Sequence, residues 1–209
     1  LFAVVLGIEV DDLFGCNDGH CTADSIRSDV QKYYGLGVRH IFPVHVFDNA
    51  YGGCAMYEDL FNVGNRIVRG EYFKVWSCRD KGYAYSYGLG EGILSILSDL
   101  VLGNPFIVGL LGQVLPPEYP PGPTCNARGL TGLGAILIQE LMAERMIIDI
   151  DHMSRVTCDE VLAIVEKANY PVVAGHTGSL WTSNAGSRAE SLKTDDQMVR
   201  LHALGALVC

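Results

Sequence analysis

Four apolar segments of this sequence each carry, at or near their end, a side chain that can bind a metal ion. These residues are Glu9 in VVLGIEV, His45 after VRHIFPV, His152 after MIIDID and His176 after YPVVAG. Neutral imidazoles together with a carboxylate are a ligand set that zinc takes, with open positions left for water. A lone histidine in an apolar strand is more often a core residue, but the same placement on four successive segments indicates one shared site. Three further histidines lack this placement and are assigned no role: His20, His40 and His202.

The segments that would position these residues alternate with helices. Apolar residues recur at helical spacing in residues 24–34 and 133–144, and further helices are expected over 160–168 and 197–203. Cap residues are expected at three of the helix starts: Thr131, a capping box of Thr157 with Glu160, and a capping box of Thr194 with Gln197. Strands joined by helices form parallel sheets, whose carboxyl ends carry the site. The pattern predicts an α/β fold, and a closed (β/α) barrel and an open doubly wound sheet both satisfy it.

Residues 51–125 interrupt this alternation. They include a Tyr- and Gly-rich stretch, the apolar run ILSILSDLVLGNPFIVGLL and the Pro-rich run PPEYPPGP. The apolar run approaches membrane-spanning length, but Asp99 and the pair Asn104-Pro105 break it. We expect one or two buried helices in an inserted cap segment, and a stiff loop at 116–123 that returns the chain to the main fold.

The composition excludes some partners. The chain has 209 residues and a formal net charge of −9, so it lacks the basic stripes that neutralise nucleic-acid phosphates. With 49% hydrophobic residues it can form one domain, residues 1–209, with a sizeable core. Because the sequence opens and closes within apolar runs, we expect an internal piece of a longer protein.

The seven cysteines bear on the compartment. If the protein is exported, the expected disulfides are Cys16–Cys21 and Cys78–Cys125. The alternative is a cytosolic protein with free buried thiols. The cysteine count favours an extracytoplasmic or secreted location only weakly. A zinc knuckle at Cys16, His20 and Cys21 is disfavoured because His20 and Cys21 are adjacent.

Beyond these patterns, the sequence resembles a known family. The runs RGLTGLGAILIQELMAERMIIDIDHMS and YPVVAGHTG are similar to the membrane (renal) dipeptidases, zinc peptidases of the amidohydrolase superfamily. GIEV and GVRHIFPVHVFDN resemble the same family in the same order. The resemblance implies a metal-dependent hydrolase acting on dipeptides or similar small amides, built on a partial (β/α)8 TIM-type barrel with the cap inserted at 51–125.

The resemblance also implies a role for each site residue. Glu9 would bridge two zinc ions, and His152 and His176 would bind one of them. His45 would be the catalytic residue that contacts the substrate and polarises its scissile carbonyl. Asn49 would belong to the same substrate-binding shell, and Arg188 would hold the substrate's carboxylate.

Three departures from the family pattern matter. Asp11-Asp12 follows Glu9 where the family has small residues, which would change the pocket or add a carboxylate behind the metal ligands. The chain begins after the family's first metal-binding strand and ends before its last, so these 209 residues alone are expected to be inactive. An incomplete barrel also exposes two sheet edges, which favours association such as a homodimer.

Two alternatives stay open at this point. The same superfamily hydrolyses lactones and N-acyl amino acids, and the inserted cap could select one of these. The chain could also be a non-catalytic barrel remnant with a binding or structural role. Replacing Arg188 would separate the first alternative from dipeptide hydrolysis, because a lactone has no free carboxylate to hold.

Overall fold

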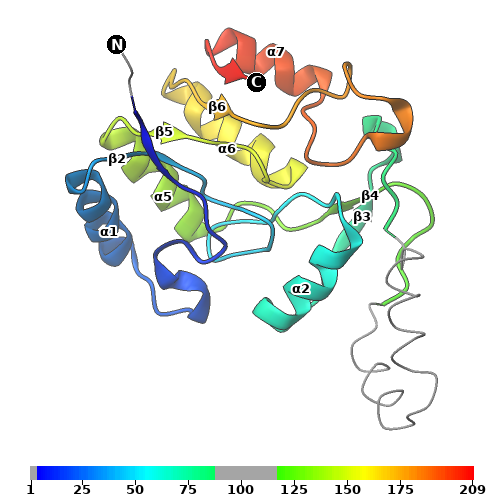
Figure 1. Cartoon of the computed structure of the whole chain (residues 1–209), viewed down its shortest axis with the longest axis horizontal. Helices are drawn as coiled ribbons and strands as arrows, with labels where there is room; N and C mark the ends of the chain where they lie inside the picture. The colour runs from blue at the N-terminus through cyan, green and yellow to red at the C-terminus, as the bar shows by residue number, and fades with distance from the viewer. Residues whose placement is uncertain (1–3, 88–116) are drawn as a thin grey trace, which may run out of the picture.

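The computed structural model describes residues 4–87 and 117–209 (Figure 1). Its α-helices are α1 (Ala23–Gly35), α2 (Asp59–Arg69), α5 (Gly132–Ala143), α6 (Arg155–Lys167) and α7 (Asp195–Ala203). Its strands are β1 (Leu6–Ile8), β2 (Val38–Ile41), β3 (Val75–Ser77), β4 (Thr124–Asn126), β5 (Ile147–Ile148), β6 (Val173–Ala174) and β7 (Leu207–Val208). Three short 3-10 helices complete the list: η1 (Leu13–Asp18), η2 (Arg79–Lys81) and η3 (Ala185–Ser187). The protein is a mixed α/β fold, as predicted.

Most of the strands belong to parallel pairs. β1, β2 and β5 form one sheet in that order, and β6 pairs with β7. A single parallel bridge between Asp149 and Val173 connects the two, and the Ile150 N–H donates to the Val173 carbonyl at 2.8 Å. The five parallel strands therefore follow one another in chain order, and the helices directly before the last four of them are α1, α5, α6 and α7. Within the described ranges these strands form small sheets and no closed barrel.

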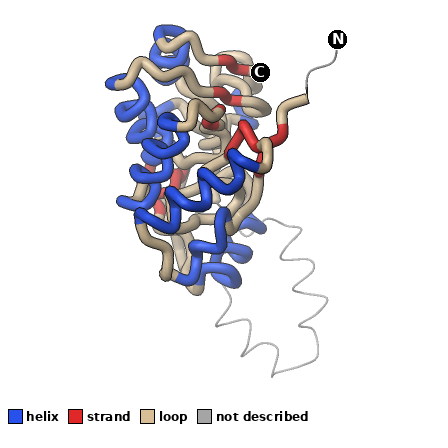
Figure 2. The backbone as a smooth tube through the Cα atoms, turned by 90° about the vertical axis from the view of Figure 1, so that its left-hand side faces the viewer, coloured by secondary structure: helices blue, strands red, loops and turns tan. Residues whose placement is uncertain are grey.

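The helices lie mostly on one side of these strands (Figure 2). α1 packs beside α5, and α5 beside α6. From α5, the side chains of Leu137, Ile138 and Leu141 are fully buried, where they meet Ile41 and Ile148 from the sheet in one apolar core. This core fixes the strands, and their carboxyl ends point to the loops that carry the predicted site residues.

Side-chain caps set several helix starts. The Thr131 hydroxyl accepts from the Gly134 N–H at the start of α5, as predicted. The capping box of Thr194 and Gln197 at α7 is also confirmed. The predicted capping box of Thr157 and Glu160 is wrong.

α6 is instead capped one turn earlier, by Ser154. The Ser154 hydroxyl accepts from the Thr157 N–H at 3.0 Å, so Thr157 lies inside the helix and is buried. Glu160 does not reach back to this helix start. Its carboxylate accepts from the Leu130 N–H at 2.6 Å, which ties α6 to the loop before α5.

The described parts of residues 51–125 contain an antiparallel pair of strands, unlike the parallel strands above. β3 and β4 form an antiparallel pair, and α2 precedes them in the chain. The Cys78–Cys125 disulfide joins the two strands' segments, and Cys16–Cys21 closes the loop at η1, so both predicted pairs are confirmed. Cys54, Cys158 and Cys209 are free thiols, the first two buried.

The apolar run at 93–111, expected as buried helices of a cap, lies outside the described residues. Among the helices that the structure does describe, none has the length and apolar character needed to cross a membrane.

Candidate metal centre

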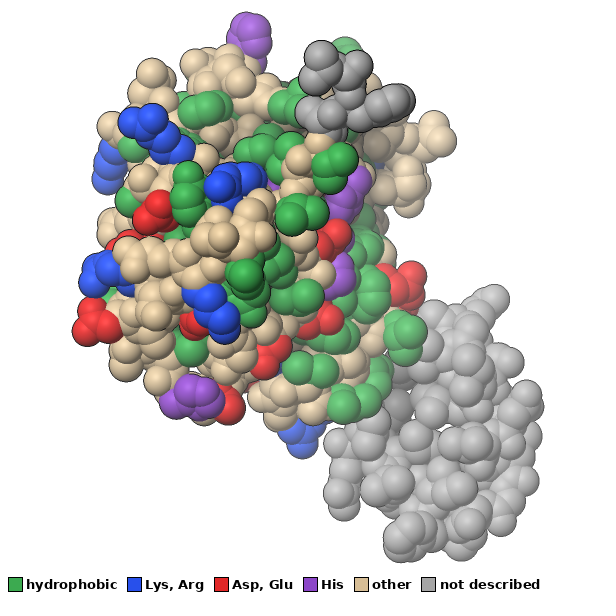
Figure 3. Space-filling view, turned by 60° about the vertical axis from the view of Figure 1, so that its left-hand side comes forward, with side chains coloured by type: hydrophobic (Ala, Val, Ile, Leu, Met, Phe, Trp, Pro, Cys, Tyr) green, Lys and Arg blue, Asp and Glu red, His purple; other side chains and the backbone are tan. Residues whose placement is uncertain are grey.

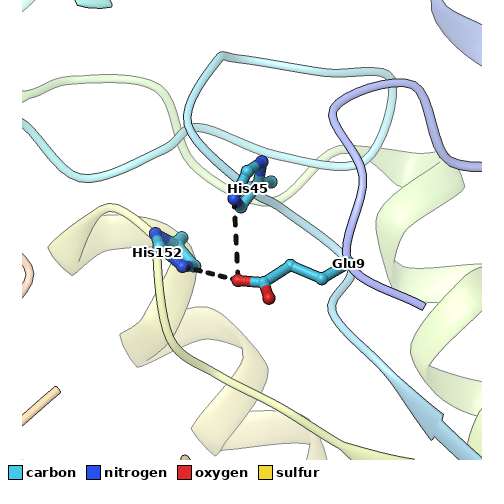
Figure 4. A group of neighbouring side chains, drawn as sticks. All are labelled: Glu9, His45 and His152. Carbon is cyan, nitrogen blue, oxygen red and sulfur yellow. Dashed lines mark hydrogen bonds and ion pairs between the residues drawn. The ribbon is translucent and has the colours of Figure 1, made fainter. Parts of the chain in front are cut away.

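Side chains from three neighbouring strands of the sheet converge at its carboxyl edge (Figure 4). Glu9 follows β1 directly, and His45 and His152 lie in the loops after β2 and β5. One carboxylate oxygen and two imidazole nitrogens of these residues all lie within 4.8 Å of one another, a group that could hold a metal ion. Figure 3 shows histidine and acidic side chains reaching the surface on one face of the molecule, between hydrophobic side chains.

The Glu9 carboxylate is the centre of the group. Its Oε1 atom lies 2.9 Å from Nε2 of His152, 3.6 Å from Nε2 of His45 and 3.5 Å from Nε2 of His176. The Nε2 atoms of His152 and His176 are 2.6 Å apart. All four residues that the sequence singled out are therefore brought together.

Both the backbone and the ring of His152 are held in place. The backbone carbonyl of His152 accepts from the Ala55 N–H at 2.6 Å, and Nδ1 of its ring lies 3.2 Å from the Tyr57 hydroxyl. Its backbone φ of 64° is in the left-handed region. Burial, with the nearby rings of His45 and His176, lowers the pKa of His152 to about 4. The ring is therefore neutral at neutral pH, the form that binds metals.

The loop carrying His176 is fixed by a buried carboxylate. Asp151 has no exposed side-chain surface; it accepts from the His176 N–H at 2.7 Å and the Thr177 N–H at 3.1 Å. The Lys193 ammonium, also buried, lies 3.1 Å from Asp151. Burial raises the pKa of Asp151, but Lys193, the Thr177 hydroxyl and the His176 N–H outweigh it and hold the pKa below its usual value. Phe42 stacks on the His176 ring with 5.4 Å between centroids.

His45 has a carboxylate partner behind it. Nδ1 of its ring lies 2.9 Å from Oδ1 of Asp11, and the Val46 N–H donates to the same oxygen at 3.1 Å. A carboxylate behind the metal ligands was expected from the Asp11-Asp12 pair; in the structure Asp11 contacts His45.

The other two predicted residues lie elsewhere. Asn49 is fully buried; its amide donates to the Pro43 carbonyl, and its Oδ1 accepts from the N–H groups of Tyr51 and Gly52. In this structure Asn49 therefore shapes the loop after His45. Arg188 lines a cavity of about 500 Å³ whose described lining contains none of the four converging residues. Contact of Asn49 or Arg188 with a substrate stays a prediction.

The donor set fits a metal ion. Ligand atoms around a tetrahedral zinc lie about 3.3 Å apart, given Zn–N distances of about 2.0–2.1 Å. The distances from Glu9 to His45 and to His176 are close to this, while the nitrogens of His152 and His176 must move apart to share one ion. One carboxylate and neutral imidazoles also suit other divalent transition metals, so the group does not by itself select zinc.

Sequence patterns missed several residues that support this site. His40 was assigned no role, yet its Nε2 lies 2.9 Å from the buried Asp149. Glu190 is buried, and its carboxylate accepts from the N–H groups of Met56, Asn126 and Arg155, which come from three separate segments. The alternation of Asp149 and Asp151 with isoleucines in IDID could have indicated such contacts, because acidic side chains in an apolar strand need hydrogen-bond or charge partners. No local pattern marks Glu190.

Comparison of this chain with protein-family models, with curated proteins and with solved structures finds no match.

Proposed function

We propose that this chain forms part of a metal-dependent hydrolase of the membrane dipeptidase kind, which hydrolyses dipeptides or similar small amides. The observation that carries the proposal is the meeting of Glu9, His45, His152 and His176 at one carboxylate oxygen. These residues come from loops after four parallel strands, where α/β enzymes place their catalytic groups. Core histidines would bond separately to backbone or side-chain partners and would not share one oxygen.

The proposal extends to the fold. Five parallel strands in chain order, with helices on one side, are what an open segment of a (β/α)8 barrel would contain. Residues 1–209 then form one incomplete domain, with 51–125 inserted at the carboxyl edge. The two disulfides support an oxidising, extracytoplasmic compartment.

Each residue has a task in this proposal. Glu9, His152 and His176 would hold zinc. When bound, zinc lowers the pKa of a coordinated water to about 7 and so supplies a nucleophile at neutral pH. Arg188 is proposed to pair with a substrate carboxylate, and Asn49 supports the loop carrying His45. The buried Asp151–Lys193 pair keeps the His176 backbone in place.

The test is metal binding by the full chain. Zinc content after dialysis is measured by elemental analysis for wild type, for the His152→Ala/His176→Ala double variant, and for the control His202→Ala, whose ring is exposed on α7. We expect bound zinc in wild type and in the control, and its loss in the double variant. Where a longer form of the chain is expressed, dipeptide hydrolysis is then assayed with it.

Two results would contradict the proposal. If wild type binds no metal under zinc-replete conditions, the metal-dependent mechanism is contradicted. A double variant that retains zinc shows that the metal is bound elsewhere. Far-UV circular dichroism confirms that all three proteins are folded.

A further inference from the structure

A second cavity, of about 230 Å³, lies between the loop after β2, the connection from α2 to β3 and the connection from β4 to α5. Its lining residues are Asp48, Glu71, Tyr72, Lys74, Ala127 and Arg128. Two hydrogen bonds hold its walls: the Ala127 N–H donates to the Lys74 carbonyl at 2.7 Å, and the Asn65 amide donates to the Glu71 carbonyl at 2.9 Å. Because typical ligand pockets measure roughly 300–1,000 Å³, an occupant of this cavity must be small.

Asp48 presents a buried carboxylate to this cavity, with only 4% of the residue exposed. Its Oδ1 atom accepts from the Cys54 N–H at 3.0 Å and from the Asn126 amide at 2.6 Å. Its Oδ2 atom has no hydrogen-bond partner among the described residues and is not enclosed by protein atoms. Burial raises the pKa of Asp48, and the same donors together with the Arg128 guanidinium oppose the rise. A nearly buried carboxylate with one open oxygen gains from a cationic partner there.

Three further charged side chains around the cavity also have unused hydrogen-bonding capacity. The Glu71 carboxylate lies 3.6 Å from Nζ of Lys74 and 3.8 Å from Nη1 of Arg128, and both distances are longer than a hydrogen bond. The Arg128 guanidinium is anchored through Nη2, which donates to the Asn49 carbonyl at 3.0 Å. The cavity therefore offers two carboxylates and two cationic groups to a ligand.

This balance of charge selects the class of ligand. A metal cation at this position would be repelled by Lys74 and Arg128. An inorganic anion would be repelled by Asp48 and Glu71. A small molecule with both charges complements all four groups. In a free α-amino acid, the ammonium offers three donors to carboxylate oxygens, and the carboxylate accepts from a guanidinium or an ammonium group.

We propose that this cavity binds the zwitterion of a small α-amino acid, with its ammonium group at Asp48 and Glu71. The ligand's carboxylate then lies at Arg128 and Lys74. The described lining contains none of the residues that converge on Glu9, so this is a separate site from the candidate metal centre. The inference does not rest on the proposed function.

The experiment titrates glycine and L-alanine into the full chain by isothermal titration calorimetry. Acetate and methylamine are the comparison probes, because each carries only one of the two charges. The variants are Asp48→Asn, which keeps an oxygen for the Cys54 N–H, and Lys74→Gln, whose side chain is 80% exposed in wild type. The matched control is Glu58→Gln, which removes an exposed carboxylate just before α2. Circular dichroism reports folding.

We expect wild type to bind both amino acids saturably and to bind acetate and methylamine at least about tenfold more weakly. Asp48→Asn should weaken amino-acid binding by about 10–100-fold, the effect of losing a hydrogen bond to a charged group. Lys74→Gln should weaken it by a smaller factor, because an exposed charge is screened by solvent. The control should bind as wild type does. The His152→Ala/His176→Ala variant should also bind normally, because the metal centre takes no part.

Several results would overturn this inference. If folded wild type shows no saturable binding of either amino acid, the site does not exist. If Asp48→Asn and Lys74→Gln both bind as wild type does, the ligand lies elsewhere. Equal affinity for acetate and glycine would indicate an anion site and contradict the zwitterion. Loss of binding in the His152→Ala/His176→Ala variant would place the amino acid at the metal centre. Zinc content is measured separately, so the two proposals succeed or fail independently.

Discussion

The two disulfides close loops of very different length, and this difference predicts their contributions to stability. The bond between Cys78 and Cys125 spans a sequence separation of 47, and that between Cys16 and Cys21 spans only 5. A disulfide limits the conformations of the unfolded chain, with an entropy that grows as the logarithm of loop length. At room temperature this corresponds to about 4 kcal/mol for the long loop and about 2 kcal/mol for the short one.

The assay is urea unfolding of three oxidised proteins: wild type, Cys78→Ala/Cys125→Ala and Cys16→Ala/Cys21→Ala. We expect the first double variant to lose about twice as much unfolding free energy as the second. Because Cys78 and Cys125 are both fully buried, the cavity left by alanine adds to the larger loss. A thiol count in denaturant gives an independent check, and we expect three free thiols in wild type.

The result that would refute the reasoning is a reversed order, with the short-loop variant the less stable. Equal losses would also contradict it, because loop length would then play no part. A count of seven free thiols in protein purified from an oxidising compartment would show that the bonds do not form.

Two further predictions concern the supports of the site. Burial raises the pKa of Glu190 from 4.5 to about 8, so between these pH values the unfolded state is ionised while the folded state keeps its proton. The contribution of Glu190 to the unfolding free energy is therefore full below about pH 4.5 and falls by up to about 1.4 kcal/mol per pH unit until about pH 8. Urea titrations should show a flatter profile for Glu190→Gln over this range, and equal slopes would contradict this. Gly134→Ala should destabilise by about 1–3 kcal/mol, because a Cβ there would lie 2.1 Å from the Tyr51 carbonyl oxygen. Gly132→Ala, in the same helix with open space around it, should be neutral or stabilise by up to about 1 kcal/mol in thermal unfolding, and a similar loss in both would show that the close approach is not the cause.

Helix starts were predictable where one cap residue was available. Thr131 and Thr194 each have a single hydroxyl at the right distance before an apolar stripe, and both cap their helices. At α6, Ser154 and Thr157 are both good caps three residues apart. The pattern of Thr157 with Glu160 favoured the later start, but Ser154 caps α6 and the Glu160 carboxylate accepts from the Leu130 N–H in another loop.

The converging residues were predictable for a topological reason. Parallel strands bring their carboxyl ends to one edge, so Glu9 and the three histidines could be grouped without knowing any contact. The partners that orient them could not be found this way. Asp11 meets His45 across 34 residues, and Glu190 meets Met56 across 134. Such contacts depend on how loops pack, which periodicity and spacing do not encode.

The left-handed backbone conformation of His152 lowers the stability of the folded protein. An L side chain in this conformation costs roughly 1–2 kcal/mol, and glycine avoids that cost. His152→Gly should therefore yield a more stable metal-free protein than His152→Ala, although both lack the imidazole. The fold alone would be served better by glycine at this position. Under the proposed function, a histidine held there against local backbone preference trades stability for metal binding. The same proposal implies that relatives of this chain with glycine at this position would keep the fold and lose the metal.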